Sequence, residues 1–221
     1  MRLTAITWPR LTEALADRIA ALKPLDGGPW PRIALDGAPA ARPDAPAQAL
    51  AEALRALGRP ALRVSAHTYW RPASIRYEHG RRDPDAYYDT WLDTGALWRE
   101  VFGPLGPGGS GRVLPSLWDP GTDRATRAAY EELPPGGVLL LDGAFLQGHG
   151  FPLDLTVHLR LSPAALERRT PPEERWTMPA FARYEAEMQP ERTADILVHT
   201  DDPNRPAWTG DGPDRSRPVA P

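Results

Sequence analysis

Three side chains that could bind a metal ion or accept a proton lie at or just after the end of a short apolar run. They are Asp36, His67 and Asp142. Carboxylates can hold a metal ion, and an imidazole with an ordinary pKa of about 6.5 can accept a hydroxyl proton near neutral pH. If the runs are parallel strands, their carboxyl ends meet at the edge of the sheet where ligands bind. The spacing therefore predicts that all three side chains line one edge of the sheet.

The segment from Gly37 to Asp44 occupies the place of a phosphate-binding loop, between a predicted strand and a predicted helix. In the pattern G-x-x-x-x-G-K-[ST], glycine lets the backbone approach the phosphates, lysine reaches the β- and γ-phosphates, and the hydroxyl group holds Mg²⁺. The candidate loop positions are Gly37, Ala38, Pro39, Ala40, Ala41, Arg42, Pro43 and Asp44. The last three replace the defining residues, and the single lysine of the chain, Lys23, precedes the loop. We therefore expect a degenerate loop.

Asp44 allows two interpretations that lead to different chemistry. As the N-cap of a helix that begins at Ala45, its carboxylate would occupy the end of the helix that attracts anions. Two unit charges about 4 Å apart interact by about 4 kcal/mol at an effective dielectric constant of about 20, so this carboxylate would repel a phosphate. Alternatively, Asp44 and Asp142 could hold Mg²⁺ together, with Arg42 serving the phosphates. Asp142 could also simply end its strand.

The elements that must position these side chains alternate along the chain. Apolar runs predict strands at 32–36, 61–66, 137–142, 155–161 and 195–199. Periodic apolar residues predict helices at 11–23 and 45–57. Three further helices are predicted in the segments between the strands, near 84–101, 163–169 and 179–188. This alternation predicts an α/β fold with a mainly parallel sheet of about five strands flanked by helices. We expect one domain over residues 1–202 and a disordered, proline-rich tail over 203–221.

Aromatic residues concentrate in one stretch, because residues 68–130 hold ten of the 18 in the chain. One interpretation is a small satellite core beneath an insertion. The other is a cap, over 68–135, whose rings face a flat ligand such as a nucleobase. Since Tyr69 and Trp70 follow a predicted strand directly, we expect this stretch to fold over the ligand-binding edge.

Composition excludes several classes of function. A net charge of −3 argues against general nucleic-acid binding, and no apolar run approaches the roughly 20 residues that cross a membrane. The absence of cysteine excludes disulfides and thiolate metal sites, and the five histidines lack H-x-x-x-H zinc spacing. Residues 106–111 match G-x-G-x-x-G but lie in a loop without the strand and helix that a dinucleotide fingerprint needs. We expect a soluble, cytoplasmic protein with a small-molecule ligand.

A series of short motifs between residues 10 and 205 has a recognisable order. The motifs are Asp36-Gly37, Ser65 with Tyr69-Trp70-Arg71-Pro72, Pro84-Asp85-Ala86-Tyr87-Tyr88, residues 104–109, residues 138–143, Arg168-Arg169, Arg183-Tyr184 and Ala194-Asp195. Their order and spacing resemble the uridine kinase family of P-loop nucleoside kinases, and most closely its bacterial uridine-kinase-like branch. The resemblance implies a P-loop fold and, if the protein is active, ATP and Mg²⁺ as cofactors for phosphorylation of a nucleoside 5′-hydroxyl group.

The resemblance also implies roles for individual residues. In the family, an aspartate of the second-strand motif acts as the base, and His67 stands at that position, either as a replacement base or as a relic of a lost site. Asp142 matches the acidic residue associated with Mg²⁺. Substrate and phosphate contacts would come from Tyr69, Trp70, Arg71, Tyr87, Tyr88, Arg168, Arg169 and Arg183. The three later arginines could instead form a solvated helix face paired with Glu167 or Glu185.

Three hypotheses about function follow. The first is a pseudokinase that binds a nucleoside or another small ligand with little or no phosphotransfer. The second is an active ATP- and Mg²⁺-dependent nucleoside kinase that uses Arg42 and His67. The third is a protein-interaction scaffold without a small ligand. Because the loop lacks its cation and its hydroxyl group, we expect phosphoryl transfer to be impaired.

Overall fold

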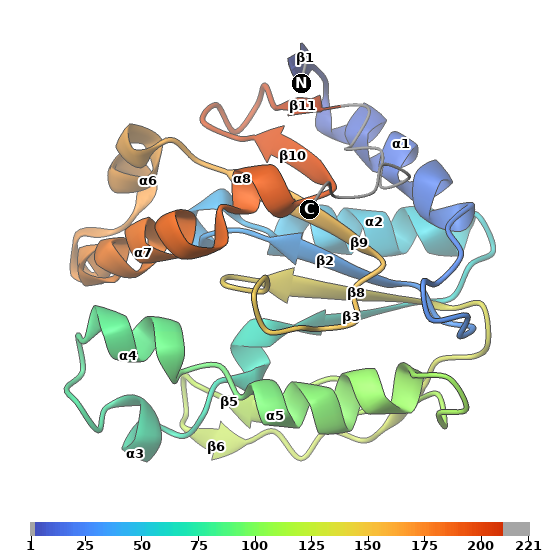
Figure 1. Ribbon diagram of the computed structural model, residues 1–221, viewed down its shortest axis with the longest axis horizontal. Helices are drawn as coiled ribbons and strands as arrows, with labels where there is room; N and C mark the ends of the chain where they lie inside the picture. Colours follow the sequence, from blue (N-terminus) through green and yellow to red (C-terminus); the bar gives the residue numbers. More distant parts are fainter. Residues whose placement is uncertain (1–2, 210–221) are drawn as a thin grey trace, which may run out of the picture.

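The computed structural model describes residues 3–209, which form a central sheet with helices on both faces (Figure 1). The sheet strands are β1 (Leu3–Ala5), β2 (Arg32–Asp36), β3 (Ala61–Ser65), β8 (Val138–Gly143), β9 (Leu155–Arg160), β10 (Ile196–His199) and β11 (Ala207–Thr209). The α-helices are α1 (Trp8–Ala20), α2 (Asp44–Ala56), α3 (Ala73–Arg76), α4 (Pro84–Asp89), α5 (Thr94–Leu97), α6 (Pro163–Arg169), α7 (Met178–Met188) and α8 (Pro190–Thr193).

Shorter elements connect these strands and helices. The 3₁₀ helices are η1 (Pro39–Ala41), η2 (Ala66–Tyr69), η4 (Gly103–Leu105) and η5 (Pro172–Thr177), and η3 (Trp98–Phe102) is a π-helical turn that continues α5. Two small ribbons pair β4 (Arg112–Val113) with β7 (Glu131–Glu132) and β5 (Trp118–Asp119) with β6 (Arg124–Ala125). None of the helices in the described part combines the length and apolar character that crossing a bilayer takes.

The seven strands lie in the order β1-β11-β10-β9-β2-β8-β3. The five strands predicted from the sequence are all present, and each pairs in parallel with its neighbour among β10, β9, β2, β8 and β3. Asp36 is level with Gly143, and Ser65 is level with Asp142. The predicted α/β fold is therefore confirmed, and β2, β8 and β3 end at the same edge of the sheet.

The sheet ends on one side in two antiparallel strands that the sequence did not predict. β11 pairs with both β10 and β1, and the hydroxyl group of buried Thr209 accepts a hydrogen bond from the Leu197 amide. The predicted disordered tail is therefore wrong for residues 207–209, because Trp208 packs against the core and Thr209 closes the sheet. Residues 203–206 are also placed, since the Pro203 and Pro206 carbonyl groups accept hydrogen bonds from Trp8 and Ile6, whereas the rest of the predicted tail, 210–221, lies outside the described residues.

One face of the sheet is covered by α1 and α2. Leu11, Leu15 and Ile19 form the buried stripe of α1, and Leu50 and Leu54 form that of α2. The i, i+4 spacing places these residues on one side of each helix, as the sequence pattern predicted. Both stripes pack on apolar side chains of β2, β8 and β9.

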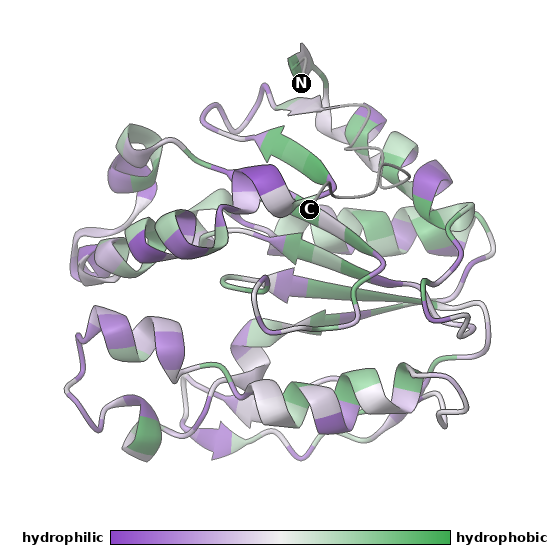
Figure 2. Cartoon of the chain, in the orientation of Figure 1, coloured by the Kyte–Doolittle hydropathy of each residue, from purple (hydrophilic) through white to green (hydrophobic). Residues whose placement is uncertain are grey.

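The predicted insertion, 68–135, divides between two locations. Leu97, Val101 and Phe102, in and after α5, are buried against Leu139 and Leu141 on the second face of the sheet. The segment with α3 and α4 instead packs toward α7, beyond the strand ends (Figure 1). Figure 2 shows the central strands as mainly hydrophobic and α4 as largely hydrophilic. Only part of the stretch therefore lies at the ligand-binding edge, and the rest completes the core.

Candidate functional site

A cavity of about 270 Å³ lies at the carboxyl ends of β2, β8 and β3. The predicted site residues that line it are Gly37, Pro39, Pro43, Asp44, His67, Trp70, Tyr87 and Asp142. Ligands of open α/β sheets bind beyond the carboxyl ends of the strands, so the position of this cavity is the expected one. The structure thus brings together half of the candidate loop, the candidate base and two of the aromatic residues.

Asp142, at the end of β8, is almost fully buried and pairs with Arg63 of β3. The Nε and Nη2 atoms of Arg63 donate to the two carboxylate oxygens at 2.5 and 3.1 Å. Burial raises the pKa of Asp142, and the guanidinium group acts in the opposite direction. Both oxygens therefore already have a cationic partner, which sequence reasoning missed because it did not single out Arg63.

His67 lies in η2, directly after β3, and lines the cavity. Its ring packs edge-on against Trp70, with 4.2 Å between the ring centroids. Burial and the positive charge of Arg76 lower the pKa of His67 below its usual value. The imidazole is therefore neutral at pH 7, which leaves one ring nitrogen able to accept a proton or a hydrogen bond.

Aromatic rings form a second wall of the site. Trp70 makes edge-on contacts with Tyr87 and Trp91, at centroid distances of 5.9 and 5.1 Å. Beyond them lies a cavity of about 240 Å³ that shares His67, Trp70 and Tyr87 with the first and adds Trp91 and Trp176. Trp91 and Trp176 were not predicted as site residues. The two adjoining cavities provide ring faces for a flat ligand.

The loop between β2 and α2 directs few of its amide groups outward. Gly37, Ala41 and Arg42 each donate their N–H to a backbone carbonyl group, at 2.8 to 2.9 Å, and Pro39 and Pro43 have no N–H. Five of the eight loop positions therefore have no N–H to offer a phosphate. Phosphate-binding loops depend on such N–H groups, so this geometry departs from theirs.

Arg42 and Asp44 interact with each other. Arg42 adopts a left-handed conformation, with φ of 57°, and its Nη2 atom lies 3.2 Å from Oδ2 of Asp44. α2 begins at Asp44 itself, and Pro43 takes the N-cap position, so the predicted capping role of Asp44 is wrong. Ala41 and Arg42 line a different cavity, of about 260 Å³, together with Arg169.

These residues do not fit a complex of ATP and Mg²⁺. The loop has a carboxylate where the pattern has a hydroxyl group, and Arg42 is paired with that carboxylate. The second candidate metal ligand, Asp142, is held by Arg63. Within residues 3–209, no cluster of three or more histidine, aspartate or glutamate side chains is arranged so that it could hold a metal ion.

Several predicted substrate contacts lie away from the first cavity or serve the fold. Tyr69 is fully buried, and its hydroxyl group donates to the Leu114 carbonyl group. The backbone of Arg71 bonds to Trp91 and Arg76. Tyr88 packs edge-on against Phe145 and Tyr184. Tyr69 and Tyr88 therefore make the contacts of packing residues, and the contacts of Arg71 are those of its backbone.

The predicted phosphate-binding arginines do not converge. Arg168 is exposed on α6, and Arg169 donates to the Thr200 carbonyl group at 2.8 Å. Arg183 on α7 pairs with Asp85 and Asp89 of α4 and with a glutamate on its own helix. Its contacts therefore tie α4 to α7 rather than point into the first cavity.

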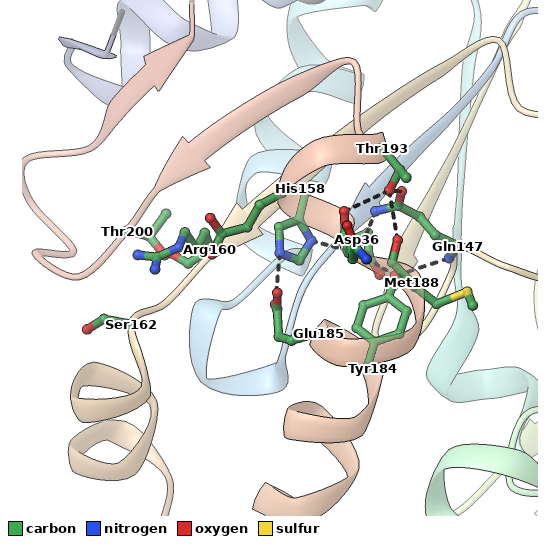
Figure 3. Close-up of polar contacts among 12 residues, drawn as sticks. Asp36, Gln147, His158, Arg160, Ser162, Tyr184, Glu185, Met188, Thr193 and Thr200 are labelled. Atoms are coloured by element: carbon green, nitrogen blue, oxygen red, sulfur yellow. Dashed lines mark hydrogen bonds and ion pairs between the residues drawn. The ribbon is translucent and has the colours of Figure 1, made fainter. Parts of the chain in front are cut away.

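The carboxylate of Asp36 also faces away from the expected site, although Asp36 ends its strand at the predicted edge. Its oxygens accept hydrogen bonds from His158 Nδ1 at 2.7 Å, from Tyr184 at 2.8 Å and from Gln147 at 3.2 Å (Figure 3). The Leu146 amide adds a fourth bond at 3.0 Å. The three strand ends thus lie at one edge of the sheet, as predicted, but the carboxylate of Asp36 is completely buried and does not line the cavity that His67 and Asp142 line.

Neither protein-family models nor curated protein sequences give a match to this chain. Solved structures do, and they place the chain in the kinase-like class of α/β folds. A possible uridine kinase from Bacillus stearothermophilus has a TM-score of 0.67 and 20% identity, over 86% of this chain and 98% of the other. A putative fructose transport system kinase from Silicibacter sp. TM1040 has a TM-score of 0.59 and 24% identity, over 86% and 95%.

A third solved structure, the YGR205w protein, has a TM-score of 0.53 and 10% identity, over 76% of this chain and 84% of the other. At these identities the likeness shows the fold alone, an α/β fold with a mostly parallel central sheet flanked by helices.

Proposed function

We propose that this protein is a uridine-kinase-like pseudokinase. It binds a small flat ligand, such as a nucleoside, in the cavity at the carboxyl ends of β3 and β8, and it transfers little or no phosphate from ATP. The proposal includes the cytoplasmic location expected from the sequence.

The main support for this proposal is the structure of the loop between β2 and α2. Its arginine is paired with its own aspartate, Asp44, and most of its amide groups are absent or already bonded. Phosphoryl transfer depends mainly on positioning and on stabilisation of negative charge. A loop with a carboxylate in place of the hydroxyl group, and with five of its eight positions lacking a free N–H, supplies little of either.

The ligand side of the proposal is supported by the aromatic wall. Trp70 and Tyr87 line both adjoining cavities, and rings of this kind bind the face of any base. The likeness of the fold to a possible uridine kinase supports a nucleoside as the first ligand to test.

Calorimetric titration of the purified protein with uridine and cytidine, with and without Mg-ATP, tests this proposal. We expect saturable binding of a nucleoside without Mg-ATP, and at least a tenfold loss of affinity in Trp70→Leu. The matched control is Trp98→Leu, because Trp98 is a more exposed tryptophan that packs against Phe102 and Phe151 instead. Equal loss in both variants would contradict the assignment of the cavity, and binding of neither nucleoside would favour a scaffold.

The active kinase is a second candidate because His67 supports it. A neutral imidazole at the cavity can accept a hydroxyl proton, which is what a kinase base does. ATP-dependent 5′-phosphorylation of a nucleoside that is abolished in His67→Ala would establish this candidate and overturn the pseudokinase.

Repair of the loop tests the cause of the proposed inactivity. The double variant Pro43→Lys with Asp44→Thr restores the cation and the hydroxyl group of the pattern and frees Arg42. We expect it to bind Mg-ATP when the parent chain does not. A ligand at 100 times its Kd stabilises a fold by about 2.7 kcal/mol, which is measurable as a shift in Tm.

A further inference from the structure

Behind the loop, on the side of α7, His158 connects two carboxylates. Its Nδ1 atom is bonded to buried Asp36 at 2.7 Å, and its Nε2 atom faces Glu185 of α7 at 3.7 Å (Figure 3). The second distance is longer than a hydrogen bond. His158 is 4% exposed, whereas the Glu185 side chain is 44% exposed. One face of a buried imidazole is thus firmly bonded, and the other has a loose partner that can swing into solvent.

His158 and Glu185 line a cavity of about 300 Å³ between β9, α6 and α7. Most of its lining residues are apolar, among them Leu166, Met178 and Phe181. Its other polar residues include Arg160 and Glu191, which pair with each other. Ligand pockets have this composition, with mostly apolar walls and a few polar groups that fix orientation.

We propose that this cavity is a second ligand site, which binds a small carboxylic acid with an apolar body. The carboxylate of the ligand replaces Glu185 at Nε2 of His158, and the apolar body packs against Phe181, Leu166 and Met178. The site adjoins the first cavity, with which it shares Gly37 and Phe145, and it shares Leu166 and Phe181 with the ring-lined cavity beyond, but neither of those cavities is lined by His158 or Glu185.

The charges around His158 support an anionic ligand. Burial alone would lower the pKa of His158, but the bond to Asp36 and the nearness of Glu185 outweigh it and raise the pKa to about 9. The imidazole is therefore a cation at pH 7 with an N–H on each nitrogen. When Glu185 moves out, a ligand carboxylate restores the lost partner and makes the close, charge-assisted bond that Glu185 does not make.

Titration with 3-phenylpropanoate, followed by calorimetry and by the imidazole NMR signals of His158, tests this proposal. The matched probes are 3-phenylpropanol and 3-phenylpropylamine, which have the same ring and chain with a neutral or a cationic end. We expect the acid to bind at least tenfold more tightly than either, and to shift the Nε2 signal. Equal binding of the alcohol, or tighter binding of the amine, would overturn the proposal.

Two variants test separately the charged contact at His158 and the apolar lining of the cavity. Glu185→Gln removes the competing carboxylate and is expected to tighten binding of the acid at least threefold, whereas Glu187→Gln, on the same helix, serves as its control. Ala182→Trp adds an indole at an exposed lining position and should abolish binding without affecting the buried pair. Absence of saturable binding to both the parent chain and Glu185→Gln, or binding unchanged by Ala182→Trp, refutes the site.

Discussion

At the scale of single residues, the Arg63 guanidinium governs the chemistry of Asp142. A carboxylate at the end of β8 would bind a cation if it were free, but Arg63 contacts both of its oxygens. Removal of one partner of a largely buried pair leaves a charge without compensation, whereas replacement of both partners by apolar groups of similar shape is often tolerated.

Arg63→Met is therefore expected to lower the free energy of unfolding by about 2 to 4 kcal/mol at pH 7. Because Asp142 then lacks its guanidinium, its already raised pKa should rise further, and the loss should diminish as pH falls and the carboxyl group is protonated. Urea denaturation at pH 7 and pH 5 measures both effects. The double variant Arg63→Met with Asp142→Leu should recover most of the loss, and failure to recover would contradict this account of the pair.

His158 predicts a pH dependence of stability with a defined sign. Its pKa in the folded protein is raised to about 9 from a usual value of about 6.5, so the folded state binds the proton more tightly than the unfolded state. The stabilisation, about 3 kcal/mol at most, is complete below pH 6.5 and disappears as pH rises through 9.

His158→Gln should therefore destabilise the protein most at pH 6 and least at pH 10, as measured by urea denaturation across that range. His79→Gln is the control, because His79 is exposed on the surface. A difference between parent and His158→Gln that stays constant with pH would disprove the assigned pKa.

At the scale of elements, a charged clamp holds α4 against α7. Arg183 pairs with Asp85 and Asp89, and its guanidinium lies 4.6 Å above the ring of Tyr88. Arg183→Met is expected to speed amide hydrogen exchange in α4 with little change in global stability, since surface pairs contribute little to the whole fold. The control is Arg192→Met on α8, where exchange in α4 should remain as in the parent chain. Unchanged exchange in the Arg183 variant would show that the clamp is not needed.

The sequence predicted some elements closely and others poorly, for physical reasons. The strand predicted at 32–36 matches β2 because its residues are buried on both faces and read as a continuous apolar run. The helix predicted over 84–101 is instead interrupted, because Asp83 and Asp93 each cap a new helix with their side chains. Each carboxylate accepts from a backbone N–H three residues on, at 2.8 to 2.9 Å, and thereby starts the helix afresh.

The sequence predicted those residues of the candidate site that lie at or next to the end of a strand. His67, Trp70 and Asp142 reach the first cavity because each lies at or just after a strand end. The bond between Asp36 and His158 joins residues 122 positions apart on neighbouring strands, and no local pattern reports such a contact. A histidine within an apolar strand was the one signal in the sequence. Its partner, Asp36, could be identified only once the order of the strands in the sheet was known.

At the scale of the whole molecule, the last described strand completes the sheet. β11 covers the edge of β10, and β1 pairs with β11 alone. A chain truncated after residue 202, the domain boundary expected from the sequence, should lose about 2 to 4 kcal/mol of stability with the buried surface of Trp208 and Thr209. It should also aggregate more readily, since β10 becomes an unprotected edge strand.

A chain truncated after residue 209 provides the control for this experiment, because it keeps β11 and its pairing with β10 and β1. Urea denaturation and light scattering compare the two truncated chains with the full chain. If the shorter chain is as stable and as soluble as the longer one, β11 does not contribute to the fold in the way described.

The pairing of β1 with β11 also makes a circular permutation of the chain possible. Leu3 lies opposite Thr209, so the first and last described residues are neighbours across an antiparallel ladder. A two-residue Asn-Gly turn between them would make a β-hairpin of two strands that are now joined only through the entire protein. New termini could then open at Gly80, where residues 78–82 are all exposed and Gly80 has open space around it. Such a circular permutant should keep the native sheet, because the order in which the strands are connected would change while their neighbours would not.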